Sequence, residues 1–168
     1  MNLASVTRRS FAGRLTALFS AAGFAGAALT GTAAASPRPE DGVRKLDGDG
    51  KPADTKSFIT PIVIHNGVAY IAGVGAHDPG PADKFEIGAH TTKVMDNIKK
   101  LVETAGGTMD SVLQLGVFLA DIKYYDGMNA VFKTYFPNGG PARTTVAVAA
   151  LPGNSLVEIN CCVAIGKK

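Results

Sequence analysis

The sequence has few residues from which a disulfide framework or a metal centre could be built. Of 168 residues only two are cysteines, Cys161 and Cys162, and they are neighbours. Adjacent side chains of a strand point to opposite faces of a sheet, so a bond between these two thiols would strain the backbone. Three histidines, His65, His77 and His90, show no metal-ligand spacing with each other or with the cysteines. The pattern predicts free cysteines in the core and no metal site.

Beyond the first 35 residues the sequence also lacks a net charge, because acidic and basic residues are equal in number there. That leader holds three of the seventeen basic residues, Arg8, Arg9 and Arg14, and none of the fourteen acidic residues, so the rest carries fourteen of each. Binding to nucleic acid relies on a basic surface. The balance therefore argues against a nucleic-acid partner for the body of the protein. The length and the apolar fraction of 46% predict one globular domain with a real core.

The first 35 residues have the layout of an export signal. The basic stretch TRRSFAG is followed by a run rich in Ala, Leu, Phe and Gly, and then by the small-residue stretch TAAAS, residues 32–36. Such a layout is typical of a signal peptide that is removed, and the pair Arg8 and Arg9 resembles a twin-arginine signal. A retained membrane anchor is the alternative, but the Gly, Ser and Thr content makes the run weakly hydrophobic. We expect a periplasmic mature protein with no stable membrane association.

The segment from residue 36 to residue 56 is rich in Pro, Gly, Asp and Lys, and it predicts a flexible arm ahead of a domain at 57–168. The following stretch, ITPIVIHNGVAYIAG at 59–73, predicts two strands joined at Asn66-Gly67. This dipeptide accepts the positive φ values of a tight hairpin turn.

Two amphipathic helices follow from the spacing of apolar residues. The first is predicted between Gly88 and Gly107 and the second over 124–136, with a strand over 111–121 between them. The apolar positions that recur at helical spacing are Val94, Ile98, Leu101, Val102 and Ala105 in the first helix, and Met128, Phe132 and Tyr135 in the second.

The last two predicted strands flank Leu151-Pro152-Gly153-Asn154 and read as a second hairpin. Hairpins at both ends exclude a purely parallel sheet and favour a mixed α+β fold. Two helices can cover only one face of that sheet. The last strand has Val157, Ile159, Cys161 and Val163 on one side, and Asn160, Cys162 and Ala164 on the other. The second face thus keeps apolar side chains, which usually means self-association, and we expect a homo-oligomer.

The C-terminal part resembles the Rid family, also called YjgF. The matching residues there are Pro141, Ala142, Arg143, Thr144, Leu151, Pro152, Val157, Glu158 and Ile159. Further matches in the helices are Asn129, Phe132, Tyr135 and Phe136, and Asn97, Ile98 and Gly106. The resemblance covers roughly 59–165. It implies a chorismate-mutase-like α+β fold, assembled as a homotrimer with the sheets forming an inner barrel, the helices outside and a cleft between each pair of subunits.

The same resemblance implies a reaction. Family members hydrolyse reactive 2-imino or enamine acids to the 2-keto acid and ammonia, with neither a metal nor an organic cofactor. In that scheme Arg143 grips the substrate carboxylate, Glu158 positions the attacking water, and Asn129 orients substrate or water. A guanidinium can meet a carboxylate with two donors and stays charged when partly desolvated. A held water and a nearby proton acceptor suffice for attack on an imine carbon.

The residues alone also allow a purely structural interpretation, in which Arg143 and Glu158 form an ion pair at an interface. Their spacing raises a further question. If the last two strands turn at Pro152-Gly153, Glu158 lies opposite Ala147, and at ~3.3 Å per residue Arg143 is more than about 10 Å further along. Either the long arginine side chain and a bulge close this gap, or one residue serves the cleft of a neighbouring subunit.

Several positions depart from the family pattern. The family's Ser-Gly-Gln is Ala72, Gly73 and Val74 here, a family tyrosine aligns with Ile59, and a position that is often cysteine is Thr145. The residues expected to contact the substrate are Arg143, Thr145, Ala72, Gly73, Ile59 and Pro152. Loss of the hydroxyl groups supports an alternative function, a non-catalytic trimer that holds a small carboxylate such as a keto acid in the same cleft.

Overall fold

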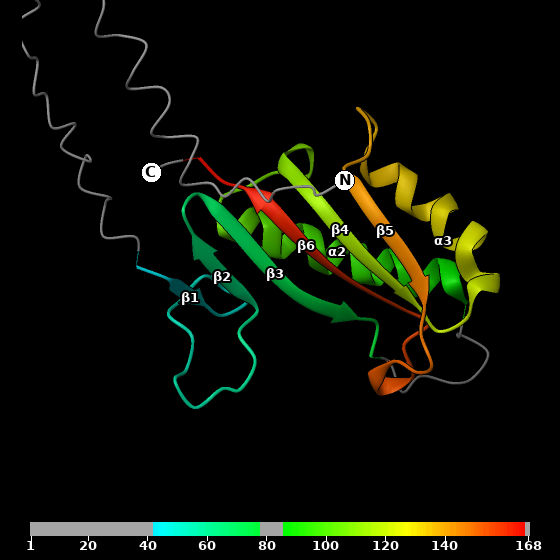
Figure 1. Cartoon of the computed structure of the whole chain (residues 1–168), viewed down its shortest axis with the longest axis horizontal. Helices are drawn as coiled ribbons and strands as arrows, with labels where there is room; N and C mark the ends of the chain where they lie inside the picture. Colours follow the sequence, from blue (N-terminus) through cyan, green and yellow to red (C-terminus); the bar gives the residue numbers. More distant parts are fainter. Residues whose placement is uncertain (1–41, 78–85, 167–168) are drawn as a thin grey trace, which may run out of the picture. The chain divides into compact units, whose positions relative to one another are not determined.

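The computed structural model describes residues 42–77 and 86–166. The predicted export signal, residues 1–35, lies outside the described residues, as does the first part of the predicted arm. Within the described residues, six strands form one sheet in the order β1-β2-β3-β6-β4-β5, and helices α2 and α3 lie beside it (Figure 1). No described helix is both long enough and apolar enough to cross a bilayer.

The predicted first hairpin is confirmed. Strands β2 (Ile62–His65) and β3 (Val68–Gly75) pair antiparallel across a two-residue turn. Asn66 and Gly67 have φ values of 51° and 75°. These are the positive values that such a turn requires, and Asn and Gly tolerate them best.

The sheet begins earlier than the sequence predicts. Strand β1 (Arg44–Leu46) lies inside the predicted arm and pairs antiparallel with β2. After β1, the side chain of Asp47 accepts hydrogen bonds from the backbone N–H groups of Asp49 and Lys51, which fixes a turn. The prediction of a flexible arm was wrong for this part because β1 is a short, polar edge strand without apolar alternation, and pairing with β2 orders it.

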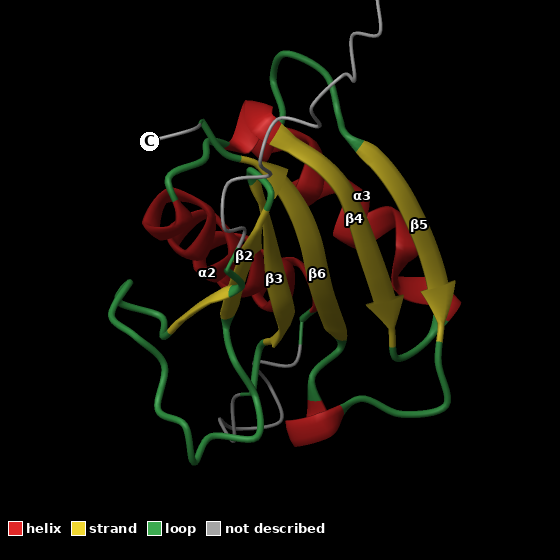
Figure 2. Ribbon diagram, turned by 60° about the vertical axis from the view of Figure 1, so that its left-hand side comes forward, coloured by secondary structure: helices red, strands yellow, loops and turns green. Residues whose placement is uncertain are grey.

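Both predicted helices are present. Helix α2 (Ile87–Ala105) ends at Gly106, whose φ of 94° is a left-handed conformation that suits glycine. Helix α3 (Tyr125–Phe132) continues into a 3₁₀ turn, η4 (Lys133–Tyr135). Figure 2 shows both helices on one side of the sheet, as predicted.

The predicted C-terminal hairpin is wrong. Strand β6 (Val157–Ala164) lies between β3 and β4 (Val112–Leu119), and β5 (Ala142–Ala147) pairs in parallel with β4 at the edge of the sheet. The reason is burial. Alternate residues of β6 are buried, which suits a central strand, whereas β5 carries polar side chains that an edge tolerates. The mixed α+β fold itself is confirmed.

The core lies between the helices and one face of the sheet. Its largest fully buried side chains are those of Ile62, Met95, Ile98, Leu115, Leu119, Met128 and Ile159. Both cysteines are free, as predicted, but only Cys161 lies in the core, whereas Cys162 is partly exposed because it points to the other face of β6. Burial raises the pKa of the Cys161 thiol to about 12, with Cys162 adding to the effect. On the face away from the helices, Tyr70 of β3 and Val146 of β5 are 47% and 41% exposed. A single chain thus leaves apolar surface uncovered there.

Candidate functional site

Arg143 lies on edge strand β5 and reaches toward α3, where uncharged groups hold it. Its Nη1 donates a hydrogen bond to Asn129 Oδ1 at 2.8 Å, and its Nη2 donates to the Tyr125 hydroxyl at 3.4 Å. The guanidinium carbon lies 4.6 Å from the ring centre of Phe132 and 5.8 Å from that of Tyr125. Aromatic faces stabilise a cation without neutralising it. Within the described part of the chain, no carboxylate lies within ion-pair distance of Arg143.

Helix α3 presents these partners because of their spacing. Tyr125, Asn129 and Phe132 stand at i, i+4 and i+7, so they share one face of the helix. Phe132 is 7% exposed and the neighbouring Met128 is fully buried, so this face packs against the sheet. The packing holds Asn129 against Arg143. The structure thus places Asn129, which was predicted to orient substrate or water, in direct contact with Arg143.

Glu158 lies on β6 and points away from the helices. In the register it pairs with Gly75 of β3 and with Phe118 of β4. Strand β3 has a bulge between Ile71 and Val74 at this point. A Cβ atom placed on Gly73, inside the bulge, would overlap the Glu158 Oε1 atom. Because Gly73 has no side chain, the carboxylate can lie directly against the backbone of β3.

Arg143 and Glu158 do not meet within one chain. Arg143 pairs with the buried Leu115 and shares its face of the sheet, whereas Glu158 flanks the buried Val157 and Ile159 and so points to the opposite face. Strand β4 also lies between the strands that carry them. The arginine side chain and a bulge therefore do not close the gap, and the two residues form no ion pair within a single subunit.

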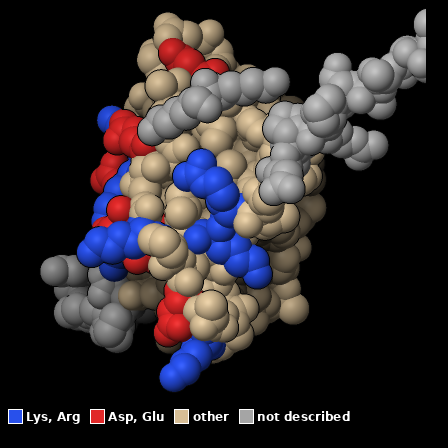
Figure 3. All heavy atoms as spheres, turned by 90° about the vertical axis from the view of Figure 1, so that its left-hand side faces the viewer, with Lys and Arg blue, Asp and Glu red and all other residues tan. Residues whose placement is uncertain are grey.

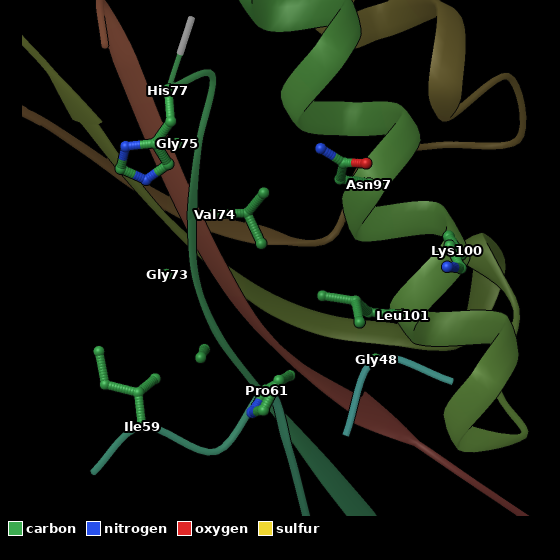
Figure 4. A pocket seen from close by; sticks show the side chains of 11 residues that line it. Gly48, Ile59, Pro61, Gly73, Val74, Gly75, His77, Asn97, Lys100 and Leu101 are labelled. Carbon is green, nitrogen blue, oxygen red and sulfur yellow. The ribbon is translucent and has the colours of Figure 1, made fainter. Parts of the chain in front are cut away.

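A cavity of about 380 Å³ lies beside the end of β3, past the point where β2 stops (Figure 4). Ile59, Ala72 and Gly73, which we predicted to contact the substrate, all line it. Its remaining lining residues are Gly48, Pro61, Val74, Gly75, His77, Asn97, Lys100 and Leu101. The side chains of Ile59, Ala72, Val74 and Leu101 make much of this wall apolar. Polar atoms come from Asn97, His77 and Lys100, whose Nζ lies 3.2 Å from Asp49 Oδ1.

Thr145 and Pro152 lie apart from this cavity. Thr145 stands two residues after Arg143 on β5, and its hydroxyl is buried without a hydrogen-bond partner in the described structure. Pro152 is exposed and begins the 3₁₀ turn η5 (Pro152–Asn154). The other predicted residues form two groups in one chain. One contains Arg143 and Asn129, and the other contains Glu158 with the cavity-lining Ile59, Ala72 and Gly73.

Sequence reasoning missed Tyr125 and His77. The i, i+4 relation of Tyr125 to Asn129 could have indicated the first. His77 was considered only as a metal ligand, and its neighbours Gly75 and Gly153 come together only in the folded chain. Among the described residues, no group of three His, Cys, Asp or Glu side chains could hold a metal ion.

Comparison with known proteins identifies the family. The family model for endoribonuclease L-PSP matches residues 50–165. A RutC family protein of Sulfurisphaera tokodaii is 38% identical over 92 residues, which are 54% of this chain and 74% of the relative. A candidate endoribonuclease L-PSP of Entamoeba histolytica has a similar structure, with a TM-score of 0.62 and 31% identity over 71% of this chain and 98% of that one.

A second similar structure carries the Rid name. YyfA of Yersinia pestis, a protein of unknown function of the conserved Rid protein family, is 28% identical with a TM-score of 0.61, over 73% of this chain and 98% of its own. The match to the family model and the relatives agree with the motifs around Arg143 and Glu158. The chain therefore belongs to the endoribonuclease L-PSP family, in which the Rid, YjgF and RutC proteins are grouped.

Proposed function

We propose that this protein hydrolyses small 2-imino or enamine acids to the 2-keto acid and ammonia. The observation that carries the proposal is the environment of Arg143. Its partners are an amide oxygen, a hydroxyl and two aromatic rings, and no described carboxylate neutralises it. A partly buried guanidinium held in this way retains its charge and offers further N–H donors to the carboxylate of a substrate.

The proposed site is shared between two copies of the chain. Within one subunit, Arg143 lies on the helix side of edge strand β5, and Glu158 lies on the other face beside the bulge of β3. A neighbouring copy that covers the open face of the sheet can bring its own arginine to this glutamate. The uncovered Tyr70 and Val146 favour such an assembly, and the resemblance implies a homotrimer. Arg143 of one subunit and Glu158 of the next then form each site.

The chemistry follows from these roles. Arg143 fixes the substrate carboxylate, and Asn129 holds the guanidinium in place while its amide can orient substrate or water. Glu158 accepts a proton from the water that attacks the imine carbon. Overall, an imino acid and one water give a keto acid and ammonia. The rate gain comes mainly from holding water and substrate together, with no metal or organic cofactor in the scheme.

The cavity wall favours a second candidate, a trimer that binds a small carboxylate without catalysis. Ile59 and Ala72 line the cavity and carry no hydroxyl group, although the family pattern has hydroxyl residues at both positions. A wall of this kind can hold an apolar substrate side chain but cannot position water through those two residues. In this alternative Arg143 still grips the ligand, and Glu158 has no chemical role.

Cleavage of RNA, named for some relatives, is not proposed for this chain. Residues beyond the leader carry as many acidic as basic side chains. On the side of the molecule shown in Figure 3, acidic and basic residues both occur, and along the left of the view they lie next to one another. RNA binding depends on a positive surface that follows the phosphate backbone, and this distribution does not favour one.

We further propose export to the periplasm through a twin-arginine-type signal, on the strength of Arg8, Arg9 and the apolar run that follows them. Fractionation of cells that make the full chain tests this proposal. Export predicts a shortened protein in the periplasmic fraction, and replacement of both arginines by lysine should leave the unprocessed chain in the cytoplasm.

The activity is tested by generating 2-iminobutyrate enzymatically and trapping it with semicarbazide. Added protein should lower the amount of trapped imine, and Arg143→Ala and Glu158→Gln should each abolish this effect. If the wild-type protein leaves the trapped imine unchanged while keto acids still raise its melting temperature, the binding function is correct and the hydrolase is wrong.

A further inference from the structure

We propose that His77 is a second proton-transfer residue of this site and acts on the substrate nitrogen while Glu158 acts on the water. This inference rests on the proposed imine hydrolysis. It adds a catalytic residue that the family resemblance does not supply, since the motifs that carry the resemblance do not include His77.

The imidazole of His77 occupies a slot formed by two glycines. His77 follows β3 by two residues and is exposed. A Cβ atom on Gly75 would lie 2.9 Å from its Nε2, and a Cβ atom on Gly153 would overlap its Nδ1. Gly75 ends β3 and Gly153 belongs to η5, so two distant segments leave space for one ring. The φ of His77 is 20°, a value uncommon for a residue with a side chain.

The slot lies on the same face of the sheet as Glu158. Gly75 and Glu158 are partners in the β3–β6 register, and partners in an antiparallel pair point to the same face. In Figure 4 the imidazole lies on one side of the β3 backbone, while Val74 and Asn97 lie on the other. The carboxylate lies against Gly73 and the imidazole against Gly75. Two residues of strand separate these anchor points by ~6.6 Å, about twice the length of a hydrogen bond.

His77 also borders the cavity that Ile59, Ala72 and Gly73 line. No hydrogen bond from another described residue engages its ring nitrogens. Among the described residues, the charged groups around it come from two elements. Glu158 approaches from β6, and Lys100 lies across the cavity on α2, paired with Asp49. The segment of η5 against the ring contributes Gly153, which has no charge. The imidazole is therefore available to a ligand near Glu158.

In imine hydrolysis the nitrogen must receive two protons before it leaves as ammonia. One carboxylate that is also taking a proton from the attacking water cannot donate the first of these at the same time. As water adds, its oxygen bonds to the imine carbon, Glu158 takes one water proton, and protonated His77 donates a proton to the nitrogen. The resulting amino alcohol then collapses. Glu158 returns its proton to the nitrogen, the C–N bond breaks, ammonia leaves, and the hydroxyl proton passes to His77 as the C=O bond forms. Both residues end in their starting states, and one water is consumed.

The test compares His77→Ala and His77→Gln with the wild type in the imine-trapping assay. General acid–base catalysis typically contributes at least ~100-fold, so kcat should fall by about that factor in both variants, with KM changed far less. Glutamine keeps a hydrogen-bonding side chain but cannot carry a proton. His65→Ala removes an imidazole elsewhere in the chain, where His65 contacts Asn66, and should leave kcat unchanged.

Two further measurements separate chemistry from structure. Added imidazole should restore part of the activity of His77→Ala through the vacated slot, beyond its own effect on the imine without protein. Gly75→Ala, whose new methyl group displaces the ring, should lower kcat in the wild type but cause no further loss in His77→Ala.

The failure of this inference is distinguishable from failure of the proposed function. If the wild type hydrolyses the imine and depends on Arg143 and Glu158, but His77→Ala and His77→Gln keep full kcat, the role of His77 is wrong and the hydrolase stands. A loss in His77→Ala that imidazole does not reverse also overturns the inference, because His77 is then structural. If the wild type itself is inactive, the proposed function fails and the role of His77 fails with it.

Discussion

At the scale of single residues, the site depends on which groups the fold places beside Arg143 and Glu158. Arg143 is held by Asn129, Tyr125 and Phe132, which leave its charge uncompensated. Glu158 lies against a glycine instead of beside a cation in the same chain. Charged groups buried for stability alone are generally paired. The unpaired state of Arg143 within the described chain therefore points to a ligand or to a second subunit.

Replacement of Arg143 by lysine separates charge from geometry. Lysine keeps the charge but loses the planar fork that contacts a carboxylate through two bonds, as well as its stacking on Phe132. A hydrogen bond to a charged group contributes about 1.5–3 kcal/mol, so kcat/KM should fall by roughly 10- to 100-fold. Steady-state kinetics in the trapping assay measures this fall. Arg44→Lys on exposed β1 is the matched control and should keep the activity of the wild type. If Arg143→Lys is as active as the wild type, the role of Arg143 is contradicted.

At the scale of elements, the bulge of β3 positions Glu158. The register of β3 on β6 shifts between Ile71 and Val74, and Gly73 in this bulge leaves room for the carboxylate. The sequence shows a glycine at this position, but it does not show which side chain the glycine admits. That contact depends on the pairing of β3 with β6, whose residues lie far apart in the chain.

A methyl group at Gly73 should displace Glu158. Gly73→Ala places a Cβ atom where Glu158 Oε1 lies, so imine hydrolysis should fall nearly to the level of Glu158→Gln. The melting temperature should change little, because Gly73 is exposed and its φ is not in the left-handed range. Gly140→Ala is the control, since a Cβ atom there meets nothing within 4 Å. Full activity of Gly73→Ala would show that the position of the carboxylate does not matter.

The hydrogen bond between Tyr135 of η4 and Asp96 of α2 should make the stability of the fold vary with pH in the alkaline range. The Tyr135 hydroxyl donates its proton to Asp96 Oδ1 at 2.8 Å, and the Thr92 carbonyl oxygen is a second acceptor within reach at 3.3 Å. Burial, followed by the hydrogen bond to Asp96 and its charge, raises the pKa of Tyr135 from 10.0 to about 12. Because the folded state holds this proton more tightly, its stabilising effect is present below pH 10 and is lost as the pH rises to about 12.

Thermal unfolding of wild type and Tyr135→Phe between pH 9 and about 12 checks this expectation. The advantage of the wild type in melting temperature should shrink as the pH rises through this interval. Parallel curves for the two proteins would mean that the tyrosine titrates alike in the folded and unfolded states.

At the scale of the whole molecule, local features of the fold could be predicted and distant pairings could not. The turn at Asn66-Gly67 and the end of α2 at Gly106 follow from the conformations that single residues allow. The position of β6 between β3 and β4 depends on the burial of its alternate side chains against residues that lie far away in the sequence. The predicted hairpin between β5 and β6 was therefore wrong. Motifs predicted Arg143, Glu158 and Asn129 as residues of one site. The contact of Arg143 with Asn129 and the opposite faces of Arg143 and Glu158 emerged only from the fold.

The same separation makes assembly part of the proposed function. Each chain contributes an arginine on one side of its sheet and a glutamate on the other. An isolated subunit would lack a complete site. The open face with Tyr70 and Val146 is the surface that a neighbouring subunit can cover.

Mixing two inactive variants tests the shared site most directly. Arg143→Ala and Glu158→Gln are denatured together in equal amounts, refolded and assayed for imine hydrolysis, beside each variant refolded alone. When trimers assemble at random from equal amounts of the two variants, about a quarter of all sites combine an intact arginine from one subunit with an intact glutamate from its neighbour. We predict recovery of about a quarter of the wild-type rate from two proteins that are inactive separately. A mixture as inactive as its components, although it forms mixed oligomers, would contradict a site built from Arg143 of one subunit and Glu158 of the next.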